Sequence, residues 1–219
     1  MNGCSYKYKY VLFDLDGTLT NSQEGIVNSV IYALRKMGYD LPKKEELLSF
    51  IGPPLRDSFK KYCNMDGGGA EAAVKLYRER YSKKGLYELS VYEGVYETLE
   101  KITERGQIAV IATSKPEGFT KKILEKTELA KYFSLVVGSE LDGTRDRKSE
   151  VIEEALRLLG EPDRKDVIMV GDTHFDVEGA MINGISCIGV TYGFAKDGEL
   201  INAGAVSCVE HFSDLLKII

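Results

Sequence analysis

The spacing of hydrophobic residues divides the chain into two kinds of structure. From Tyr92 onward, short apolar runs alternate with segments of helical periodicity, and this pattern predicts a parallel sheet with crossover helices. The apolar run 10–13 belongs with these strands. The other expected strands are 107–112, 133–138, 166–171, 185–190 and a short one at 205–209, and the expected helices are 94–105, 117–126, 149–159, one that ends at Met181, and a C-terminal helix.

Residues 21–88 show helical periodicity and no strand pattern. The first helix is expected to have its N-cap at Ser22 and to stop at Gly38. Further helices are expected at 43–50, 55–62 and 71–84, with a rigid Gly-Pro-Pro turn at 51–54 and a flexible glycine loop at 66–69. The sequence therefore predicts an α/β fold, in which residues 1–20 and 89–219 form a parallel-sheet core and residues 21–88 form an inserted, all-helical domain.

The composition is that of a globular protein, because 43% of the 219 residues are hydrophobic and 29% are charged. A net charge of −5 provides no general attraction to a nucleic acid polymer or to an anionic membrane. We therefore expect neither as a partner. The four cysteines lie far apart and only two histidines are present, so neither a zinc site nor a disulfide framework is expected. Without a signal-peptide pattern or an apolar span of bilayer length, we expect a reduced, cytoplasmic protein.

The strand at 10–13 runs directly into two carboxylates, Asp14 and Asp16. Side chains alternate faces along a strand, so these two are expected to point the same way. Two carboxylates at the edge of a hydrophobic sheet repel each other and resist desolvation, and a divalent cation would compensate both effects. The alternative is that one aspartate merely begins a turn, since Asp-Gly is a common turn pair, and that the other is solvated.

Further polar side chains follow the expected strands at their carboxyl ends, where open parallel sheets bind ligands. Thr113, Ser114 and Lys115 follow one strand, Asp172 and Asp176 follow another, and Lys148 precedes a helix. Together they offer carboxylates for a metal, donors for an anion and an ammonium group, as phosphoryl transfer requires. Mg²⁺ suits such oxygen ligands best.

Each of these groups also has a simpler interpretation. Thr113 or Ser114 could cap the helix at 117, and Asp176 could be a first-turn acid behind a Thr173 N-cap. Lys148 could be solvated, although a lysine at a helix start opposes the helix dipole and therefore favours an anionic partner. His174 lies in the same loop as Asp172, but a solvated loop histidine is the more economical interpretation because the aspartates already supply an acid and a base.

Four segments, in this order, resemble the motifs of the haloacid dehalogenase-like hydrolase superfamily. They are Asp14-Leu15-Asp16-Gly17-Thr18, Ala112-Thr113-Ser114-Lys115, Lys148, and Gly171-Asp172-Thr173-His174-Phe175-Asp176. The resemblance covers the whole chain and implies a Rossmann-like core with the helical insertion as a cap domain. Segments 50–55 and 91–95 are similar to those of phosphoglycolate phosphatase-like proteins, some relatives of which are 5′-nucleotidases.

The resemblance implies a role for each site residue. Asp14 would be the nucleophile that forms an aspartyl-phosphate, and Asp16 would be the general acid and base. Mg²⁺ would be held by the Asp14 carboxylate, the Asp16 backbone carbonyl and the Asp172 carboxylate, with Asp176 in support. Thr113, the backbone of Ser114 and Lys148 would hold the phosphoryl oxygens. Because the dehalogenase branch lacks the second aspartate of the first motif, Asp16 indicates phosphate esters.

Two departures from the family pattern concern the substrate. Ser114 stands where many members have asparagine, and the loop 143–148 is more basic than usual, which could widen the anion site. In the cap, Arg56 is a candidate substrate contact because it follows the Gly-Pro-Pro turn, whereas Lys60 and Lys61 are expected to lie on a solvated helix face.

The leading hypothesis is a Mg²⁺-dependent phosphatase for a small phosphate monoester such as 2-phosphoglycolate or a nucleoside 5′-monophosphate, acting as a monomer or homodimer. A phosphomutase of the β-phosphoglucomutase type would use the same intermediate and return the phosphoryl group to a sugar. A receiver-like phospho-acceptor switch also combines aspartates, a hydroxyl and a lysine around Mg²⁺, but the position of the aspartate pair and the inserted domain argue against it.

Overall fold

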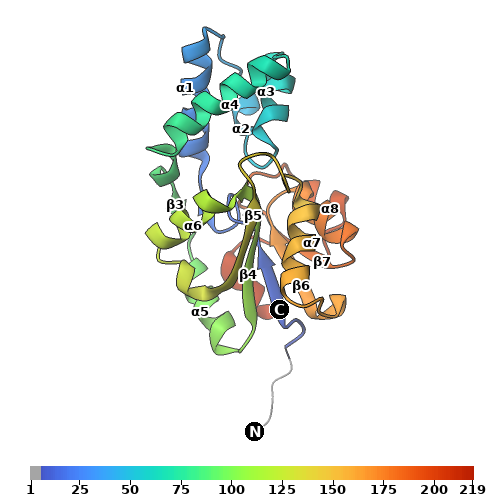
Figure 1. Cartoon of the computed structure of the whole chain (residues 1–219). Helices are drawn as coiled ribbons and strands as arrows, with labels where there is room; N and C mark the ends of the chain where they lie inside the picture. Colours follow the sequence, from blue (N-terminus) through green and yellow to red (C-terminus); the bar gives the residue numbers. More distant parts are fainter. Residues whose placement is uncertain (1–5) are drawn as a thin grey trace. The chain divides into compact units, whose positions relative to one another are not determined.

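A computed structural model describes residues 6–219, which fold into two compact units (Figure 1). One unit contains the described residues up to Thr20 together with Val91–Ile219, and the other contains Asn21–Ser90. The second boundary falls two residues after the expected one. The N-terminal residues 1–5, and with them Cys4, lie outside the description.

The first unit is built on a parallel sheet with the strand order β5-β4-β1-β6-β7-β8. β1 lies in the interior of the sheet, and its residues Val11, Leu12 and Phe13 have no exposed surface. The predicted α/β class with a Rossmann-like sheet is thus confirmed. The strands are β1 (Tyr10–Phe13), β4 (Ile108–Pro116), β5 (Phe133–Ser139), β6 (Val167–Gly171), β7 (Ser186–Val190) and β8 (Ser207–Val209).

The register of the sheet brings the chemistry-bearing strand ends together. Phe13, the last residue of β1, pairs with Ile111 of β4 on one side and with Val170 of β6 on the other. The residues that follow Phe13 and Val170, and those beyond Ile111 in β4, therefore meet at one edge of the sheet. A ligand is expected to bind at this edge, because it contains the carboxyl ends of the parallel strands.

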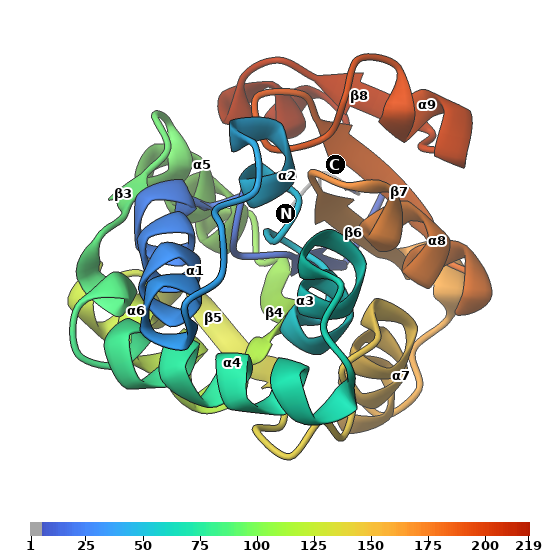
Figure 2. The same cartoon turned by 90° about the horizontal axis from the view of Figure 1, so that it is seen from above.

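Helices cover both faces of this sheet. α7 (Lys148–Leu158) and α8 (His174–Ile182) lie on one side, where their residues share a buried cluster with Leu12 and Met169. α5 (Val95–Glu104) and α6 (Glu117–Lys126) lie on the other side (Figure 2). The remaining elements of this unit are the short helix α9 (Glu199–Ala203) and the 3-10 turns η2 (Ala130–Tyr132), η3 (Arg164–Asp166) and η4 (Phe212–Lys217).

The second unit is all-helical, as expected for 21–88. Its helices are α1 (Gln23–Met37), α2 (Lys44–Leu48), α3 (Leu55–Cys63) and α4 (Gly67–Tyr81), followed by the 3-10 turn η1 (Gly85–Tyr87). The two connections between the units, β2 (Thr20–Asn21) and β3 (Ser90–Val91), pair as a two-stranded sheet. Gly38 ends α1 in the left-handed conformation, with a φ of 74°.

One local prediction for the helical unit is wrong, and another holds only in part. The glycines after Asp66 are not a flexible loop, because α4 begins at Gly67 and the Asp66 side chain accepts a hydrogen bond of 2.6 Å from the Gly69 N–H. An N-cap of this kind compensates for the poor helix propensity of glycine. Ser22 occupies the N-cap position of α1, as predicted, and its carbonyl accepts from the Ile26 N–H (3.1 Å). Its side chain makes no capping hydrogen bond, however, and its buried hydroxyl has no partner within residues 6–219.

The predictions for the α/β unit also need correction at three places. β4 extends to Pro116, so Thr113, Ser114 and Lys115 lie within the strand and not after it. The pairing of β4 with β5 shifts register between Ala112 and Pro116, so these three residues lie in an irregular part of the strand. The chain ends in a 3-10 turn in place of the expected α-helix, and α9 was not expected. Within residues 6–219, no helix has the length and apolar character needed to cross a bilayer.

Candidate active site

The loop after β1 is a tight turn that begins with a carboxylate. The Asp14 N–H donates to the Val170 carbonyl (3.0 Å), which holds Asp14 in line with β6. Gly17 has a φ of 86° and donates its N–H to the Thr20 carbonyl (2.8 Å). A side chain at Gly17 would be strained at this φ and would also collide with the Asp172 carboxylate. Glycine is therefore required where the first and last motifs approach each other.

Three buried carboxylates gather at this edge. One oxygen from each of Asp14, Asp172 and Asp176 lies within 4.8 Å of the other two, a spacing that permits a shared cation. Burial raises the pKa of the Asp172 carboxyl well above its ordinary value, and the negative charges of Asp176 and Asp14 raise it further. Burial likewise raises the pKa of Asp176. The protein by itself thus opposes the ionisation of Asp172 and Asp176.

Lys148 is the main cation beside these carboxylates. Its Nζ donates to Asp14 Oδ1 (2.6 Å) and to the Ala112 carbonyl (3.1 Å), and it lies 2.8 Å from Asp176 Oδ1. Burial alone would lower the pKa of this ammonium group, but the charges of Asp14 and Asp176 outweigh burial and raise it. The anionic partner expected for a lysine at a helix start is therefore present, and the solvated alternative is wrong.

Asp176 combines the two roles that the sequence left open. Its Oδ1 faces Lys148, whereas its Oδ2 accepts from the backbone N–H and the hydroxyl of Thr173, each at 3.1 Å. Asp176 thus belongs both to the first turn of α8 and to the polar site.

Asp172 is held by a loop that the sequence analysis did not identify. The Phe194 N–H donates to Asp172 Oδ2 (2.8 Å), while the Tyr192 hydroxyl donates to the Thr18 carbonyl (2.7 Å). The ring of Tyr92 lies 4.6 Å from that of Tyr192, measured between centroids. Burial, with the charges of Asp172 and Asp16, raises the pKa of Tyr92 to about 12. Since Phe194 contributes a backbone group, no side-chain motif indicates this contact in the sequence.

The β4 segment contributes Thr113, Ser114 and Lys115. Thr113 is buried, and its hydroxyl oxygen accepts from the Lys115 N–H (3.3 Å), which leaves the hydroxyl proton available for an anion. The Ser114 carbonyl accepts from the Ser139 hydroxyl (2.7 Å). Neither Thr113 nor Ser114 caps α6, because Pro116 occupies the N-cap position, so the capping alternative is wrong.

The second aspartate of the first motif has its own cation. Asp16 Oδ2 lies 2.8 Å from Lys115 Nζ, and both side chains are almost completely buried. Asp16 Oδ1 is also buried and has no hydrogen-bond partner in the part of the chain that is described. The sequence places Lys115 in a polar segment at the end of a strand, but it does not predict the ion pair of Lys115 with Asp16.

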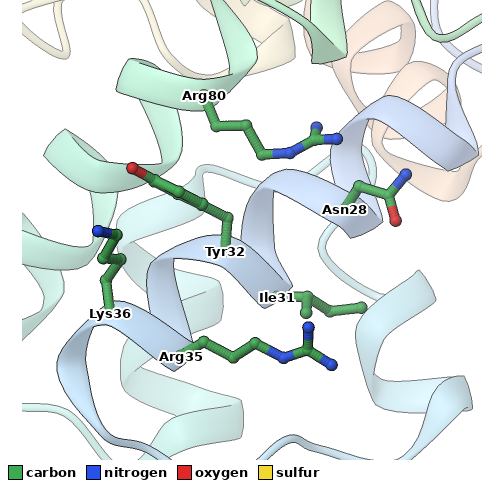
Figure 3. A pocket seen from close by; sticks show the side chains of 6 residues that line it. All are labelled: Asn28, Ile31, Tyr32, Arg35, Lys36 and Arg80. Carbon is green, nitrogen blue, oxygen red and sulfur yellow. The ribbon is translucent and has the colours of Figure 1, made fainter.

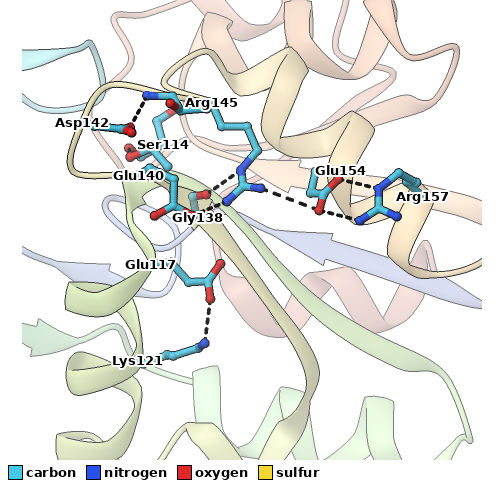
Figure 4. Close-up of polar contacts among 11 residues, drawn as sticks. Ser114, Glu117, Lys121, Gly138, Glu140, Asp142, Arg145, Glu154 and Arg157 are labelled. Carbon is cyan, nitrogen blue, oxygen red and sulfur yellow. Dashed lines mark hydrogen bonds and ion pairs between the residues drawn. The ribbon is translucent and has the colours of Figure 1, made fainter.

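The basic loop before Lys148 does not widen the anion site through Arg145. Arg145 donates to the Gly138 carbonyl (3.2 Å) and to Glu140 (2.7 Å) through two guanidinium nitrogens, and the third lies 3.7 Å from Glu154 (Figure 4). These contacts join the end of β5 to α7. The guanidinium group of Arg145 therefore forms ion pairs with Glu140 and Glu154.

His174 has a structural partner outside the carboxylate cluster. Its Nδ1 lies 2.7 Å from Glu199 Oε1, which also accepts from the His174 N–H (3.2 Å). Instead of being simply solvated, this half-exposed side chain ties the start of α8 to α9.

The cap residues named as substrate contacts are described within their own unit. Arg56 forms an ion pair with Glu71, and Lys60 and Lys61 are exposed, as expected for a solvated face. A contact between Arg56 and substrate stays a prediction. A pocket of about 530 Å³ lies between α1 and α4 and has a different lining, formed by Asn28, Ile31, Tyr32, Arg35, Lys36 and Arg80 (Figure 3).

The charge of the site fits a divalent cation. Four carboxylates meet two ammonium groups, so two negative charges remain uncompensated when all six groups are ionised. Among these four carboxylates, Asp172 is the one whose described hydrogen bonds come from a backbone N–H and a hydroxyl, and its desolvation favours another positive charge nearby. Oxygen ligands without histidine or cysteine are typical of magnesium sites.

Comparison with known proteins places this geometry in a family. The family model described as haloacid dehalogenase-like hydrolase matches residues 11–190. A 5′-nucleotidase from Pseudomonas aeruginosa is 43% identical over 200 residues, which are 91% of this chain and 90% of that protein. The pyrophosphatase PpaX from Bacillus mycoides is 31% identical over 215 residues, 97% of either chain.

A solved structure agrees in sequence and in fold. The crystal structure of a predicted phosphatase from Clostridium acetobutylicum is 45% identical and superimposes with a TM-score of 0.92, covering 97% of this chain and 98% of that one. The matched range includes β1, the irregular part of β4, Lys148 and the Asp172 loop. The chain therefore belongs to the haloacid dehalogenase-like hydrolase family.

Proposed function

We propose that this chain is a Mg²⁺-dependent phosphatase that hydrolyses a small phosphate monoester through an aspartyl-phosphate on Asp14. The observation that carries the proposal is the position of Asp14, whose Oδ1 is bound by Lys148 next to Asp172 and Asp176. A 5′-nucleotidase and a pyrophosphatase among the similar proteins support phosphate-transfer chemistry. The 43% identity to the former favours a nucleoside 5′-monophosphate over 2-phosphoglycolate as the substrate.

In the first step, an Asp14 carboxylate oxygen attacks phosphorus and the bond from phosphorus to the leaving oxygen breaks. Asp16 gives its proton to that oxygen, so the product leaves as an alcohol. Lys148, the Thr113 hydroxyl and the Ser114 backbone hold the phosphoryl oxygens. Because Lys148 also binds Asp14 Oδ1, it orients the nucleophile toward the group that it binds.

In the second step, Asp16 takes a proton from a water molecule, which attacks the phosphorus of the aspartyl-phosphate. Asp14 is regenerated and inorganic phosphate leaves. Mg²⁺, held by Asp14, the Asp16 carbonyl and Asp172 with Asp176 in support, would neutralise charge on the phosphoryl group.

Phosphate release from p-nitrophenyl phosphate with Mg²⁺ tests the nucleophile. We expect Asp14→Asn to lower the turnover by at least about 1,000-fold, because an amide cannot form the acyl phosphate. Asp163→Asn is the matched control, since Asp163 is a surface residue paired with Lys165, and it should keep full activity. If Asp14→Asn stays active, the assignment of the nucleophile is wrong.

A substrate panel then separates the alternatives. Nucleoside 5′-monophosphates, 2-phosphoglycolate, sugar phosphates and pyrophosphate are compared at equal concentration. Isomerisation of a sugar phosphate without phosphate release would indicate the phosphomutase. A phosphorylated protein that persists for hours without turnover would indicate the receiver-like switch.

A further inference from the structure

Lys115 and Lys148 occupy separate positions in the site. Lys148 contacts Asp14 and Asp176, whereas Lys115 forms an ion pair with Asp16. Lys115 projects from the irregular part of β4, is 9% exposed, and its Nζ lies 2.8 Å from Asp16 Oδ2. Each aspartate of the first motif thus has its own lysine.

A buried ion pair gives little net stability, because desolvation of both charges offsets their attraction. The pair between Lys115 and Asp16 is therefore poorly explained as a stabilising contact alone. In addition, it leaves the carboxylate half satisfied, since Asp16 Oδ1 is buried without a partner among residues 6–219. A contact that holds one oxygen of a carboxylate fixes the direction in which the other points.

We propose that Lys115 is the positioning residue of Asp16, holding Oδ2 so that Oδ1 is the oxygen that exchanges a proton with the leaving group. The inference rests on the proposed function, because it requires Asp16 to be the acid of the first step. Lys115 itself does not transfer the proton. Its backbone N–H also binds the Thr113 hydroxyl oxygen, so one residue orients both the acid and a phosphate-binding group.

The test uses two substrates that differ in how much they need an acid. p-Nitrophenolate is a good leaving group and departs without protonation, whereas the alkoxide of a nucleoside 5′-monophosphate must be protonated as it leaves. The parameter kcat/KM reports the steps up to the loss of the leaving group, before the second use of Asp16. We expect Lys115→Met to lower kcat/KM about 100-fold for the nucleotide and less than about 5-fold for p-nitrophenyl phosphate.

Two further variants complete the test. Lys115→Arg keeps the charge and a donor, and it should restore most of the loss on the nucleotide. Lys121→Met is the matched control, because Lys121 lies exposed on α6 and pairs with Glu117 of the same helix, so it should behave like the wild type. If Lys115→Met does not fold, Lys115→Gln replaces it with the same expected selectivity.

An equal loss on both substrates, or none on either, would overturn the positioning role. Asp16→Asn separates this failure from a failure of the proposed function. If Asp16→Asn shows the selective loss and the Lys115 variants do not, only the inference about Lys115 is wrong. If the wild type hydrolyses neither substrate, the proposed function fails, and the inference fails with it.

Discussion

Asp172 shows how a single residue can be placed for function at a cost in stability. It has no exposed surface, and its direct partners are the Phe194 N–H at 2.8 Å and the Thr18 hydroxyl at 3.4 Å. Because its folded-state pKa is raised, the folded protein binds a proton at Asp172 more tightly than the unfolded chain does. Without metal, stability is therefore lost as the pH rises above about 3.8, the ordinary pKa of aspartate, through the raised value.

Because ionised Asp172 lowers the stability of the metal-free protein, Asp172→Asn is predicted to raise it. At pH 7 without metal, we expect the variant to melt about 2–4 °C higher than the wild type, corresponding to roughly 1 kcal/mol in a chain of this size. Asparagine removes the buried charge and can still accept from the Phe194 N–H. Thermal unfolding with and without Mg²⁺ measures the effect, and Mg²⁺ should stabilise the wild type but not the variant.

Asp176→Asn provides the contrasting control. Asp176 is also buried and its pKa is also raised, but Lys148 compensates part of its charge, so its replacement should raise the melting temperature by less than Asp172→Asn does. If Asp172→Asn melts below the metal-free wild type, the charge of Asp172 is compensated within the protein and the argument for a cation loses its main support.

At the same scale, the sequence predicts side chains better than it predicts backbone groups. Asp14, Asp172 and Lys148 could be placed together because each lies at a position where adjacent parallel strands or their helices end. The contact between the Phe194 N–H and Asp172 could not be foreseen, since any residue supplies an N–H. The pair between Lys115 and Asp16 depends on the irregular path of β4, which the apolar pattern does not encode.

Among the elements, α7 is tied to its surroundings by polar contacts at its first residue and in its middle. Lys148 is its first residue, and Glu154 on the same helix faces Arg145, which also binds the Gly138 carbonyl and Glu140 (Figure 4). Arg145 therefore ties the helix that carries Lys148 to the end of β5. Ser139, at that strand end, holds the Ser114 carbonyl.

We expect Arg145→Ala to lower kcat/KM about 10-fold, because a small displacement of Lys148 and Ser114 is costly for phosphoryl transfer. Arg157→Ala is the matched control, since Arg157 binds the same Glu154 at 2.7 and 2.9 Å, whereas the contacts with Gly138 and Glu140 come from Arg145. It should stay within about 2-fold of the wild type, as expected for a surface ion pair. Equal effects of the two variants would mean that the link to β5 is unimportant. Steady-state kinetics with p-nitrophenyl phosphate would measure kcat/KM for both variants.

Element types were predicted better than element ends. α6 begins at Glu117 and ends at Lys126, as expected, because Pro116 sets its start. α4 begins four residues before the expected Glu71, since glycines look like a loop until the Asp66 cap is considered. Local propensity failed where a side-chain hydrogen bond to the backbone outweighed it.

The whole molecule consists of two units, one of them discontinuous in sequence. Within the helical unit, Arg80 donates two hydrogen bonds to Glu88, each 2.8 Å, and a third to the Ser29 hydroxyl (3.2 Å). The Glu88 carbonyl accepts from the Gly25 N–H (3.1 Å). These contacts join α1, α4 and the segment that leaves the unit.

Glu88 also makes the stability of this unit dependent on pH. The hydrogen bonds from Arg80 lower the pKa of Glu88 below its ordinary 4.5 and outweigh the opposing effect of burial. The contribution of the pair is therefore fully present above about pH 4.5 and is lost as the pH falls through the lowered pKa. Glu88→Gln should destabilise the helical unit by about 1–2 kcal/mol at pH 7 and by much less at pH 3.

Hydrogen exchange measured by mass spectrometry can show whether the two units respond separately. If they unfold independently, Glu88→Gln should speed exchange in peptides from 21–90 and leave those from 91–219 unchanged, whereas Mg²⁺ should protect only the latter. Glu104→Gln, which breaks an exposed pair with Lys101, should alter neither. Faster exchange of both units in Glu88→Gln would show that they unfold as one cooperative body, because loss of a contact confined to one unit would then destabilise the other.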